Sequence, residues 1–237
     1  MPTKTLGVIG GMGPAATADL YEKLLRYTDA DCDQAHVPML IDSNTRIPDR
    51  TAAILRGGED PRLELCKSAK RLESAGADLL VMACNTAHFF YDDVCAAVKT
   101  PVLHMPRITA AAVREKGYAR VVLLATTGTV QSGVYADAFA REAPCVSLLL
   151  PEEAEQAAVM SLIYEGVKAG RRAFDASAVQ AMLDRLTKAG AACFILGCTE
   201  LPLAFSMYKL AANTVDPTAL LAKEALRLCG ARLREDA

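Results

Sequence analysis

The chain has 237 residues, 52% of them hydrophobic, which is enough to bury a substantial core in one large domain or two smaller ones. Its formal net charge is −2, and no run of lysine or arginine marks a surface for polyanions. The first residues lack the pattern of a signal peptide, and no apolar run approaches the roughly 20 residues that span a bilayer. We therefore expect a cytoplasmic protein with neither a nucleic-acid nor a membrane partner.

Short apolar runs alternate along the chain with amphipathic helical patterns, as in α/β proteins. The predicted strands are residues 6–9, 37–41, 79–82, 102–105, 121–124, 147–150 and 193–196. Several are apolar throughout, which is typical of parallel strands covered on both faces. A last helix is expected over residues 217–233.

The two halves of the chain resemble each other. In each half a helical pattern ends in Ala-Gly-Ala, an apolar strand follows, and a cysteine lies eight residues after that glycine (84 − 76 and 198 − 190). The first strand and loop of each half also correspond, with Gly13 matching Gly128. The two offsets agree within one residue, since 128 − 13 = 115 and 198 − 84 = 114.

This repeat predicts two pseudo-symmetric Rossmann-like α/β domains, each with a mainly parallel central sheet, and an active site in the cleft between them. We place the N-terminal domain at residues 1–103 plus 210–237 and the C-terminal domain at 104–209. The change of domain falls where Thr100-Pro101 and Met105-Pro106 punctuate the sequence.

Eight cysteines occur without any C-x-x-C pair, in a chain too regular for a small disulfide scaffold, so we expect reduced thiols and no zinc site. Two of them, Cys84 and Cys198, lie just beyond the carboxyl ends of predicted strands and precede predicted helices. Ligands bind at this edge of α/β sheets, and the start of a helix favours a thiolate. The others are expected to be packing residues: Cys32, Cys66, Cys95, Cys145, Cys193 and Cys229.

A pair of thiols at matched positions suits the inversion of a stereocentre, because one proton must leave one face of a carbon and another must reach the opposite face. The carbanion formed needs hydrogen bonds to the adjoining carboxylate. Asn85, Thr86 and Thr199 are placed to donate them, and could also cap the helices. The pattern therefore indicates racemisation in which Cys84 and Cys198 exchange the roles of acid and base.

Four motifs carry a family resemblance: GGMGP at 10–14, IPDRT at 47–51, CNT at 84–86 and GCTE at 197–200. In this order and spacing they resemble the aspartate/glutamate racemase family over nearly the whole chain. The resemblance implies two α/β domains, an amino-acid substrate, no pyridoxal phosphate, no metal and a homodimer. It also implies that Cys84 and Cys198 are the acid/base pair.

The resemblance assigns substrate carboxylates to Arg50 and Lys168, and the planar fork of arginine suits a carboxylate. The implied substrate-binding set is Met12, Gly13, Arg50, Asn85, Thr86, Ala87, Thr127, Lys168, Thr199 and Glu200. Lys168 resembles the lysine of the aspartate-acting branch. We therefore expect aspartate as the substrate and keep glutamate open, since one methylene changes binding by only about 1–3 kcal/mol.

Parts of the sequence also fit other kinds of site. Residues 11–16 fit the G-x-G-x-x-A dinucleotide fingerprint, but Pro14 removes a backbone donor, and the next strand ends 29 residues after Gly13 (42 − 13) instead of roughly 20. Cys84 and His88 have helical spacing for a metal, which would need three or four ligands. A broad-specificity racemase and a non-catalytic module for an acidic ligand stay open, although binding alone needs no thiol pair.

Overall fold

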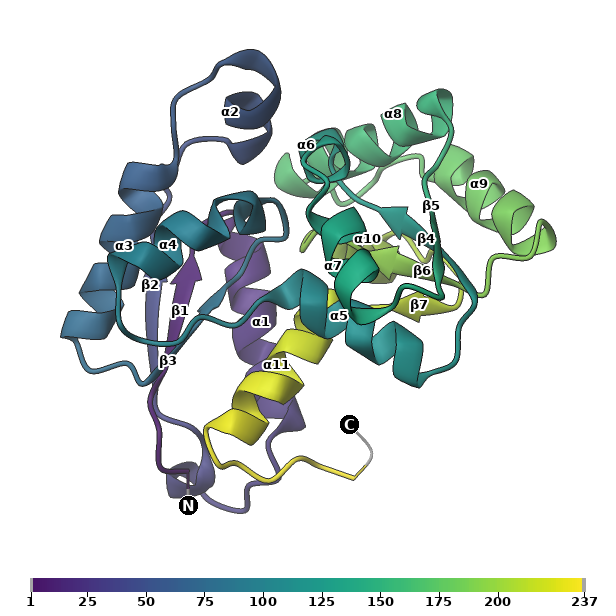
Figure 1. Ribbon diagram of the computed structural model, residues 1–237. Coiled ribbons are helices and arrows are strands. Elements are labelled where there is room, and N and C mark those ends of the chain that lie inside the picture. The colour runs from purple at the N-terminus through teal and green to yellow at the C-terminus, as the bar shows by residue number, and fades with distance from the viewer. Residues whose placement is uncertain (1, 236–237) are drawn as a thin grey trace. The chain divides into compact units, whose positions relative to one another are not determined.

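The strands of the computed structural model, which describes residues 2–235, form two separate sheets in two units (Figure 1). Unit 1 runs to Met105 and resumes at Thr218, and unit 2 comprises Pro106–Pro217. Every paired strand in both sheets is parallel to its neighbours. The predicted α/β class with two parallel sheets is confirmed.

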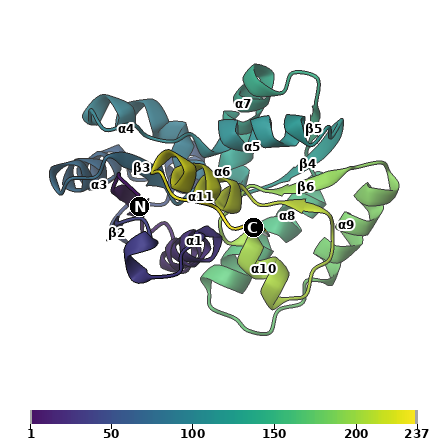
Figure 2. The same ribbon diagram turned by 90° about the horizontal axis from the view of Figure 1, so that it is seen from below.

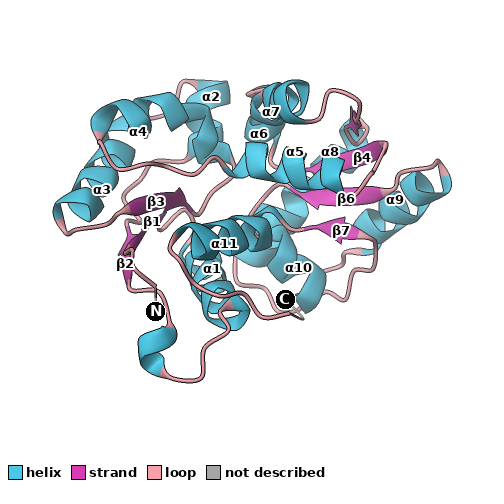
Figure 3. Cartoon of the chain, turned by 60° about the horizontal axis from the view of Figure 1, so that its bottom comes forward, coloured by secondary structure: helices cyan, strands magenta, loops and turns pink. Residues whose placement is uncertain are grey.

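The sheet of unit 1 has the order β2-β1-β3. Its strands are β1 (Leu6–Gly10), β2 (Met39–Ser43) and β3 (Leu79–Met82). Its helices are α1 (Pro14–Tyr27), η1 (Asp33–Ala35), α2 (Arg50–Arg56), α3 (Arg62–Ser74), η2 (Thr86–Phe90), α4 (Tyr91–Ala97) and α11 (Pro217–Leu228). Helices α3 and α4 cover one face of this sheet, and α1 and α11 cover the other (Figure 3). The first of these layers buries Ile9 and Met82 against Leu65 and Ala69.

The sheet of unit 2 has the order β5-β4-β6-β7. Its strands are β4 (Arg120–Leu124), β5 (Ser147–Leu149), β6 (Cys193–Leu196) and β7 (Thr214–Val215). Its helices are α5 (Met105–Glu115), α6 (Thr127–Gln131), α7 (Val134–Glu142), α8 (Glu153–Ser161), the π-helix η3 (Leu162–Lys168), α9 (Ser177–Lys188) and α10 (Leu201–Met207). Helices α5 and α7 lie on one face, and α8, α9 and α10 on the other (Figure 2). On that second face Val122 and Phe194 pack with Val159, Met182 and Leu183.

The two sheets repeat one topology, because β2-β1-β3 corresponds to β5-β4-β6. The helix before β3 and the helix before β6 both end at a left-handed glycine, Gly76 with φ 95° and Gly190 with φ 92°. Only glycine adopts such angles without strain. The repeat read from Ala-Gly-Ala in the sequence is therefore a repeat of helix, glycine turn and strand.

The predicted strand at residues 102–105 is wrong beyond its first residue. Val102 forms a single parallel bridge to Leu80, and Met105 already begins α5. Pro106 lies in the first turn of that helix, where its missing N–H costs nothing. The corresponding segment of unit 2 is β7, a strand that the sequence pattern missed. The last helix ends at Leu228, before the predicted residue 233, and a left-handed glycine follows at 230.

The chain changes units after Met105 and again after Pro217. We expected the return at residue 210, but residues 210–217 belong to unit 2 because Val215 of β7 pairs with Ile195 of β6. Helix α11 then packs in unit 1. Among residues 2–235, no helix combines the length and apolarity that crossing a membrane requires.

The glycine-rich loop after β1 is shaped by close backbone packing. Gly11 has φ +84°, and a Cβ there would lie 2.4 Å from the backbone carbon of Asn44. Its N–H donates to Oγ1 of Thr17 at 2.9 Å, and that hydroxyl donates to the carbonyl of Gly13 at 3.0 Å. Pro14 opens α1. These contacts explain the glycine spacing without a nucleotide.

Replacing Gly11 with alanine should lower the free energy of unfolding by at least about 3 kcal/mol, because strain at positive φ adds to a clash with fixed backbone. Gly57→Ala is the matched control: Gly57 has φ +62°, but no atom lies within 4 Å of its added Cβ. It should cost only about 1 kcal/mol. Urea unfolding followed by circular dichroism measures both, and equal losses would refute the clash.

Candidate active site

Cys84 lies directly after the last backbone hydrogen bond between β3 and β1 in unit 1. The N–H of Ala83 donates to the carbonyl of Ile9 at 2.9 Å, which extends the pairing of β3 with β1 by one residue. Cys84 follows directly, with its side chain 5% exposed. The helix expected after it is the short 3₁₀ helix η2, so Cys84 faces no long α-helix dipole, contrary to the prediction.

Asn85, Thr86 and Ala87 continue from the cysteine into η2 and are all buried, with 1%, 5% and 0% exposure. The predicted carboxylate donors of unit 1 are therefore adjacent to its thiol. Two buried polar side chains in consecutive positions are uncommon in a core and are typical of sites that bind polar groups.

His88 holds the backbone of Cys84. Its Nδ1 lies 2.9 Å from the carbonyl oxygen of Cys84, and the N–H of Met105 donates to its Nε2 at 3.1 Å. Because Nε2 accepts, the ring carries its proton on Nδ1 and is neutral. Burial lowers the pKa of His88 to about 4. Both ring nitrogens are occupied by backbone groups, so the geometry gives His88 a positioning role and leaves it no lone pair for a metal.

Arg50 ties two loops of unit 1 together. It is 8% exposed at the start of α2, and its Nη1 donates to the carbonyls of Pro48 and Ile47 at 2.9 and 3.3 Å. Its Nη2 donates to the carbonyl of Met12 at 3.0 Å. The structure thus brings the predicted residues Arg50, Met12 and Gly13 to one edge of the sheet, with the guanidinium bound to backbone carbonyls.

Cys198 occupies the same position in unit 2. The N–H of Gly197 donates to the carbonyl of Leu124 at 2.7 Å, and Cys198 follows with 6% exposure. A Cβ at Gly197 would lie 2.5 Å from Cδ1 of Leu123, so the glycine lets β6 and β4 pack closely. Each cysteine stands two residues beyond its strand (84 − 82 and 198 − 196).

Cys198, Glu200 and Lys168 form a polar cluster. The Cys198 Sγ donates to Oε2 of Glu200 at 3.0 Å, and Lys168 Nζ lies 3.1 Å from Oε1 of the same carboxylate. Thr199 Oγ1 also donates to Oε2, at 3.2 Å. Glu200 is 2% exposed and the Lys168 side chain 24%. Burial, and then the charge of Glu200, raise the pKa of the Cys198 thiol well above its usual value.

Lys168 is presented by an unusual helix. The segment η3 is a π-helix that continues α8 and ends at Lys168, and its Tyr164 ring lies 5.4 Å from the ammonium. Gly166 makes room for Tyr208, whose hydroxyl would be 3.1 Å from a Cβ there. π-Helical turns often occur at functional sites. Sequence reasoning missed this feature, because the apolar pattern continues smoothly from α8.

Thr127 begins α6 after β4, at the sheet edge where Cys198 emerges from β6. Its N–H contacts Sδ of Met160 at 3.2 Å, and its hydroxyl accepts from Nε2 of Gln156 at 3.4 Å. Gln156 also donates to the carbonyl of Ala125 at 2.9 Å and so holds the loop. Gln156 was not predicted, since nothing in its local sequence marks it.

The predicted residues therefore fall into two groups, one in each unit. Unit 1 assembles Met12, Gly13, Arg50, Cys84, Asn85, Thr86 and Ala87, and unit 2 assembles Thr127, Lys168, Cys198, Thr199 and Glu200. Within residues 2–235, no three or more His, Cys, Asp or Glu side chains are grouped as metal ligands would be. Each unit therefore contributes a buried thiol with hydrogen-bonding groups close to it in the sequence or in space.

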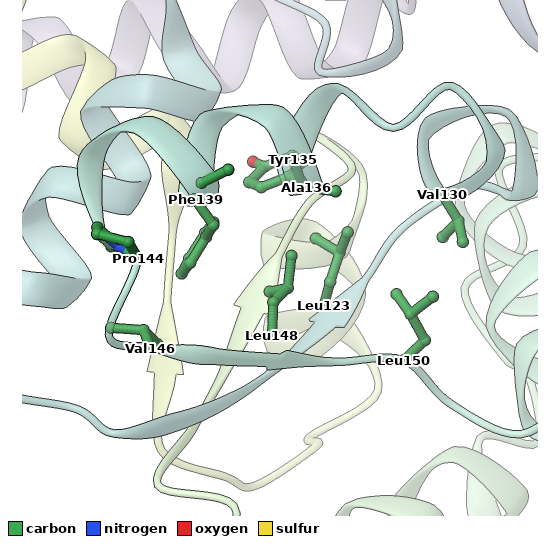
Figure 4. Close-up of a pocket in the computed structure, with 11 residues that line it drawn as sticks. Leu123, Val130, Tyr135, Ala136, Phe139, Pro144, Val146, Leu148 and Leu150 are labelled. Carbon is green, nitrogen blue, oxygen red and sulfur yellow. The ribbon is translucent and has the colours of Figure 1, made fainter.

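An apolar cavity of about 280 Å³ lies elsewhere in unit 2, under α7 (Figure 4). Leu123 of β4, Leu148 of β5 and Phe139 of α7 line it, together with Leu150. Its lining includes none of the predicted site residues.

Each of the two α/β units thus carries a buried cysteine two residues beyond the corresponding strand. A family model described as Asp/Glu/Hydantoin racemase matches residues 9–225. The chain belongs to this family, which confirms the resemblance seen in its motifs.

The fold is similar to that of the aspartate racemase of Picrophilus torridus, with a TM-score of 0.84 and 31% identity over 99% of this chain and 97% of that one. It is also similar to an aspartate racemase homologue from Pyrococcus horikoshii, with a TM-score of 0.76 and 25% identity over 96% and 100% of the two chains. The broad specificity amino-acid racemase RacX of Bacillus subtilis is 26% identical over 136 residues, 55% of this chain. The match spans only 58% of the length of RacX.

His88 gives the structure a pH dependence that can be measured. An unfolded histidine binds a proton below about pH 6.5, whereas folded His88 stays neutral until about pH 4. The stabilisation that neutral His88 gives to the folded protein is therefore complete above about pH 6.5. As the pH falls from about 6.5 to about 4, the free energy of unfolding drops by up to about 1.4 kcal/mol per pH unit. Urea unfolding of wild type and His88→Gln between pH 8 and 4 should show a shallower loss in the variant. Parallel curves would contradict the buried neutral ring.

Proposed function

We propose that this chain is a cofactor-independent racemase that inverts the Cα of an acidic amino acid, with aspartate as the main substrate and glutamate as the second candidate. The matched placement of Cys84 and Cys198 carries the proposal. Each thiol stands two residues beyond the equivalent strand, and the two are 5% and 6% exposed. Ordinary packing cysteines have no reason to recur in this way.

In the proposed reaction, one thiolate removes the Cα proton while the opposing thiol protonates the other face, and the roles exchange for the other enantiomer. This requires the two thiols to reach opposite faces of one substrate. Asn85, Thr86 and Thr199 would donate hydrogen bonds to the α-carboxylate as it gains enolate character. No electron sink such as pyridoxal phosphate takes part in this scheme.

Arg50 and Lys168 are proposed to select a second carboxylate. Arg50 lies where the GGMGP and IPDRT loops meet, bound to the carbonyl of Met12. Lys168 already pairs with a carboxylate, Glu200, at 3.1 Å, and a substrate carboxylate could be bound in the same way. The name of the Picrophilus torridus relative supports aspartate, and that of RacX supports a broader specificity as the alternative. We also expect a homodimer located in the cytoplasm.

The deciding experiment incubates the purified protein with each L-amino acid in D₂O without added cofactor. Chiral chromatography with mass spectrometry then follows the products. Cα-deuterated D-aspartate or D-glutamate would establish racemisation and identify the substrate. Deuterated D-forms of neutral amino acids at similar rates would favour the broad-specificity alternative. No inversion or exchange with any amino acid would reject the proposal in favour of an acidic-ligand binding module.

Replacing either thiol should abolish racemisation without unfolding the protein. Cys84→Ala and Cys198→Ala should each lower kcat by at least about 100-fold, because each removes an acid/base group. Cys193→Ala is the control: this cysteine lies on β6 and is 0% exposed, so it should lose stability but keep kcat. A fully active Cys84 or Cys198 variant would refute the two-base mechanism.

Lys168→Ala should raise KM for aspartate by about tenfold or more, since it removes a charge-assisted contact. KM for a neutral substrate such as alanine should change by no more than about twofold. Lys188→Ala, at the exposed end of α9, serves as the control and should change neither value. Equal effects on both substrates would remove Lys168 from the selection of acidic side chains.

A further inference from the structure

We infer that Glu200 holds Cys198 as a protonated thiol, so that Cys198 is the proton donor of the resting protein and Cys84 takes the first Cα proton. The inference rests on the proposed racemisation and deepens it, because it gives two thiols at equivalent positions different starting states. It also changes the role of Glu200, expected from the sequence to bind substrate, to that of a partner of the reacting sulfur.

The geometry identifies the sulfur as the donor. Oε2 of Glu200 lies 3.0 Å from Cys198 Sγ and also accepts from Thr199 Oγ1 at 3.2 Å, while Oε1 lies 3.1 Å from the Lys168 ammonium. A carboxylate with an ammonium on one oxygen and a hydroxyl donor on the other is favoured in its ionised form. An ionised carboxylate can only accept, so the shared hydrogen belongs to sulfur.

The electrostatics agree with this assignment. A thiolate at Cys198 would place a second negative charge 3.0 Å from the Glu200 carboxylate, at a site where both side chains are almost entirely buried. Lys168 on η3 opposes this effect, but it contacts the far oxygen of the carboxylate. Tyr135 of α7 interacts electrostatically with Cys198, and burial raises the pKa of its hydroxyl far above the usual range, so it stays neutral. The charge in hydrogen-bond contact with Cys198 is thus negative.

The resting protein then acts on the enantiomer whose Cα proton faces Cys84, and the other enantiomer requires the reverse protonation of the two cysteines. The Cys84 thiolate forms an S–H bond with the Cα proton, and the electron pair of the broken C–H bond is delocalised into the substrate carboxylate. The S–H bond of Cys198 breaks, and its proton is delivered to the opposite face of Cα. Cys198 is left as a thiolate beside Glu200. Once the product leaves, Cys198 takes up a proton from solvent and Cys84 releases one to solvent. No oxidant or reductant is involved.

The test measures the protonation of each thiol separately. The full-length protein is alkylated with iodoacetamide across a range of pH, and mass spectrometry follows the peptides that contain Cys84 and Cys198. Only the thiolate reacts at an appreciable rate, so the pH of half-maximal rate reports its formation. The variants are Glu200→Gln, Lys168→Met and Glu165→Gln, the last being an exposed glutamate of η3 that serves as the matched control.

In Glu200→Gln, the Cys198 profile should move to lower pH by about one unit, because the negative charge is removed and the shape is kept. In Lys168→Met it should move to higher pH, because the nearby cation is removed. Glu165→Gln should not move it, and the Cys84 profile should stay in place throughout. Shifts of opposite sign from two members of one cluster are not produced by general loosening of the fold.

A Cys198 profile unmoved in Glu200→Gln, or moved in the same direction by both variants, would overturn the inference. Should Glu200→Gln fail to fold, Lys168→Met decides alone, and an absent or downward shift overturns it. If the wild type racemises aspartate but the Cys198 profile does not move in Glu200→Gln, the proposed function stands and the role of Glu200 is rejected. A wild type that racemises nothing rejects the proposed function and the donor role with it, whatever the profiles show.

Discussion

One backbone hydrogen bond in each unit sets the position of the buried cysteine. Ala83 N–H to the Ile9 carbonyl in unit 1 and Gly197 N–H to the Leu124 carbonyl in unit 2 are the last contacts between adjacent parallel strands. In each unit the next residue is a cysteine, which therefore lies at the carboxyl edge of its sheet. Parallel pairing brings the loop after the central strand to the same edge, and this is how the glycine-rich loop and Thr127 come to lie there.

The elements that carry the cysteines could be predicted because their signal is local. The strands at 79–82 and 193–196 have the predicted bounds, since each is a wholly apolar run between a glycine turn and a polar loop. The sheet edge beside β3 in unit 1 and beside β6 in unit 2 could not be predicted. Val102 contributes a single bridge and β7 has only two residues, too few to show any periodicity. The unit boundary near residue 210 was misplaced for this reason.

The motifs named the candidate site residues, but the contacts of these residues could not be predicted. Arg50 was expected to face substrate, and the structure shows its guanidinium holding the carbonyls of two loops. Lys168 and Glu200 were both placed in the substrate set, and the structure joins them in an ion pair. They are 32 residues apart in the sequence (200 − 168) and meet because a π-helix ends at Lys168. Side-chain direction over such a separation depends on tertiary packing, which no local pattern reports.

The backbone of the two units is nearly repeated, whereas the charges around the two thiols are not. In unit 1 a neutral imidazole contacts the backbone carbonyl of Cys84, whereas in unit 2 the sulfur of Cys198 contacts a carboxylate that is paired with an ammonium. A two-base inversion needs one thiol protonated and the other ionised at the moment substrate binds. Two identical environments would favour both thiols equally, and much of the protein would rest with two thiols or two thiolates. In the proposed inversion, the carboxylate beside Cys198 favours the mixed state with a Cys198 thiol over the one with a Cys198 thiolate, so side chains that do not repeat distinguish the two halves of a repeated fold.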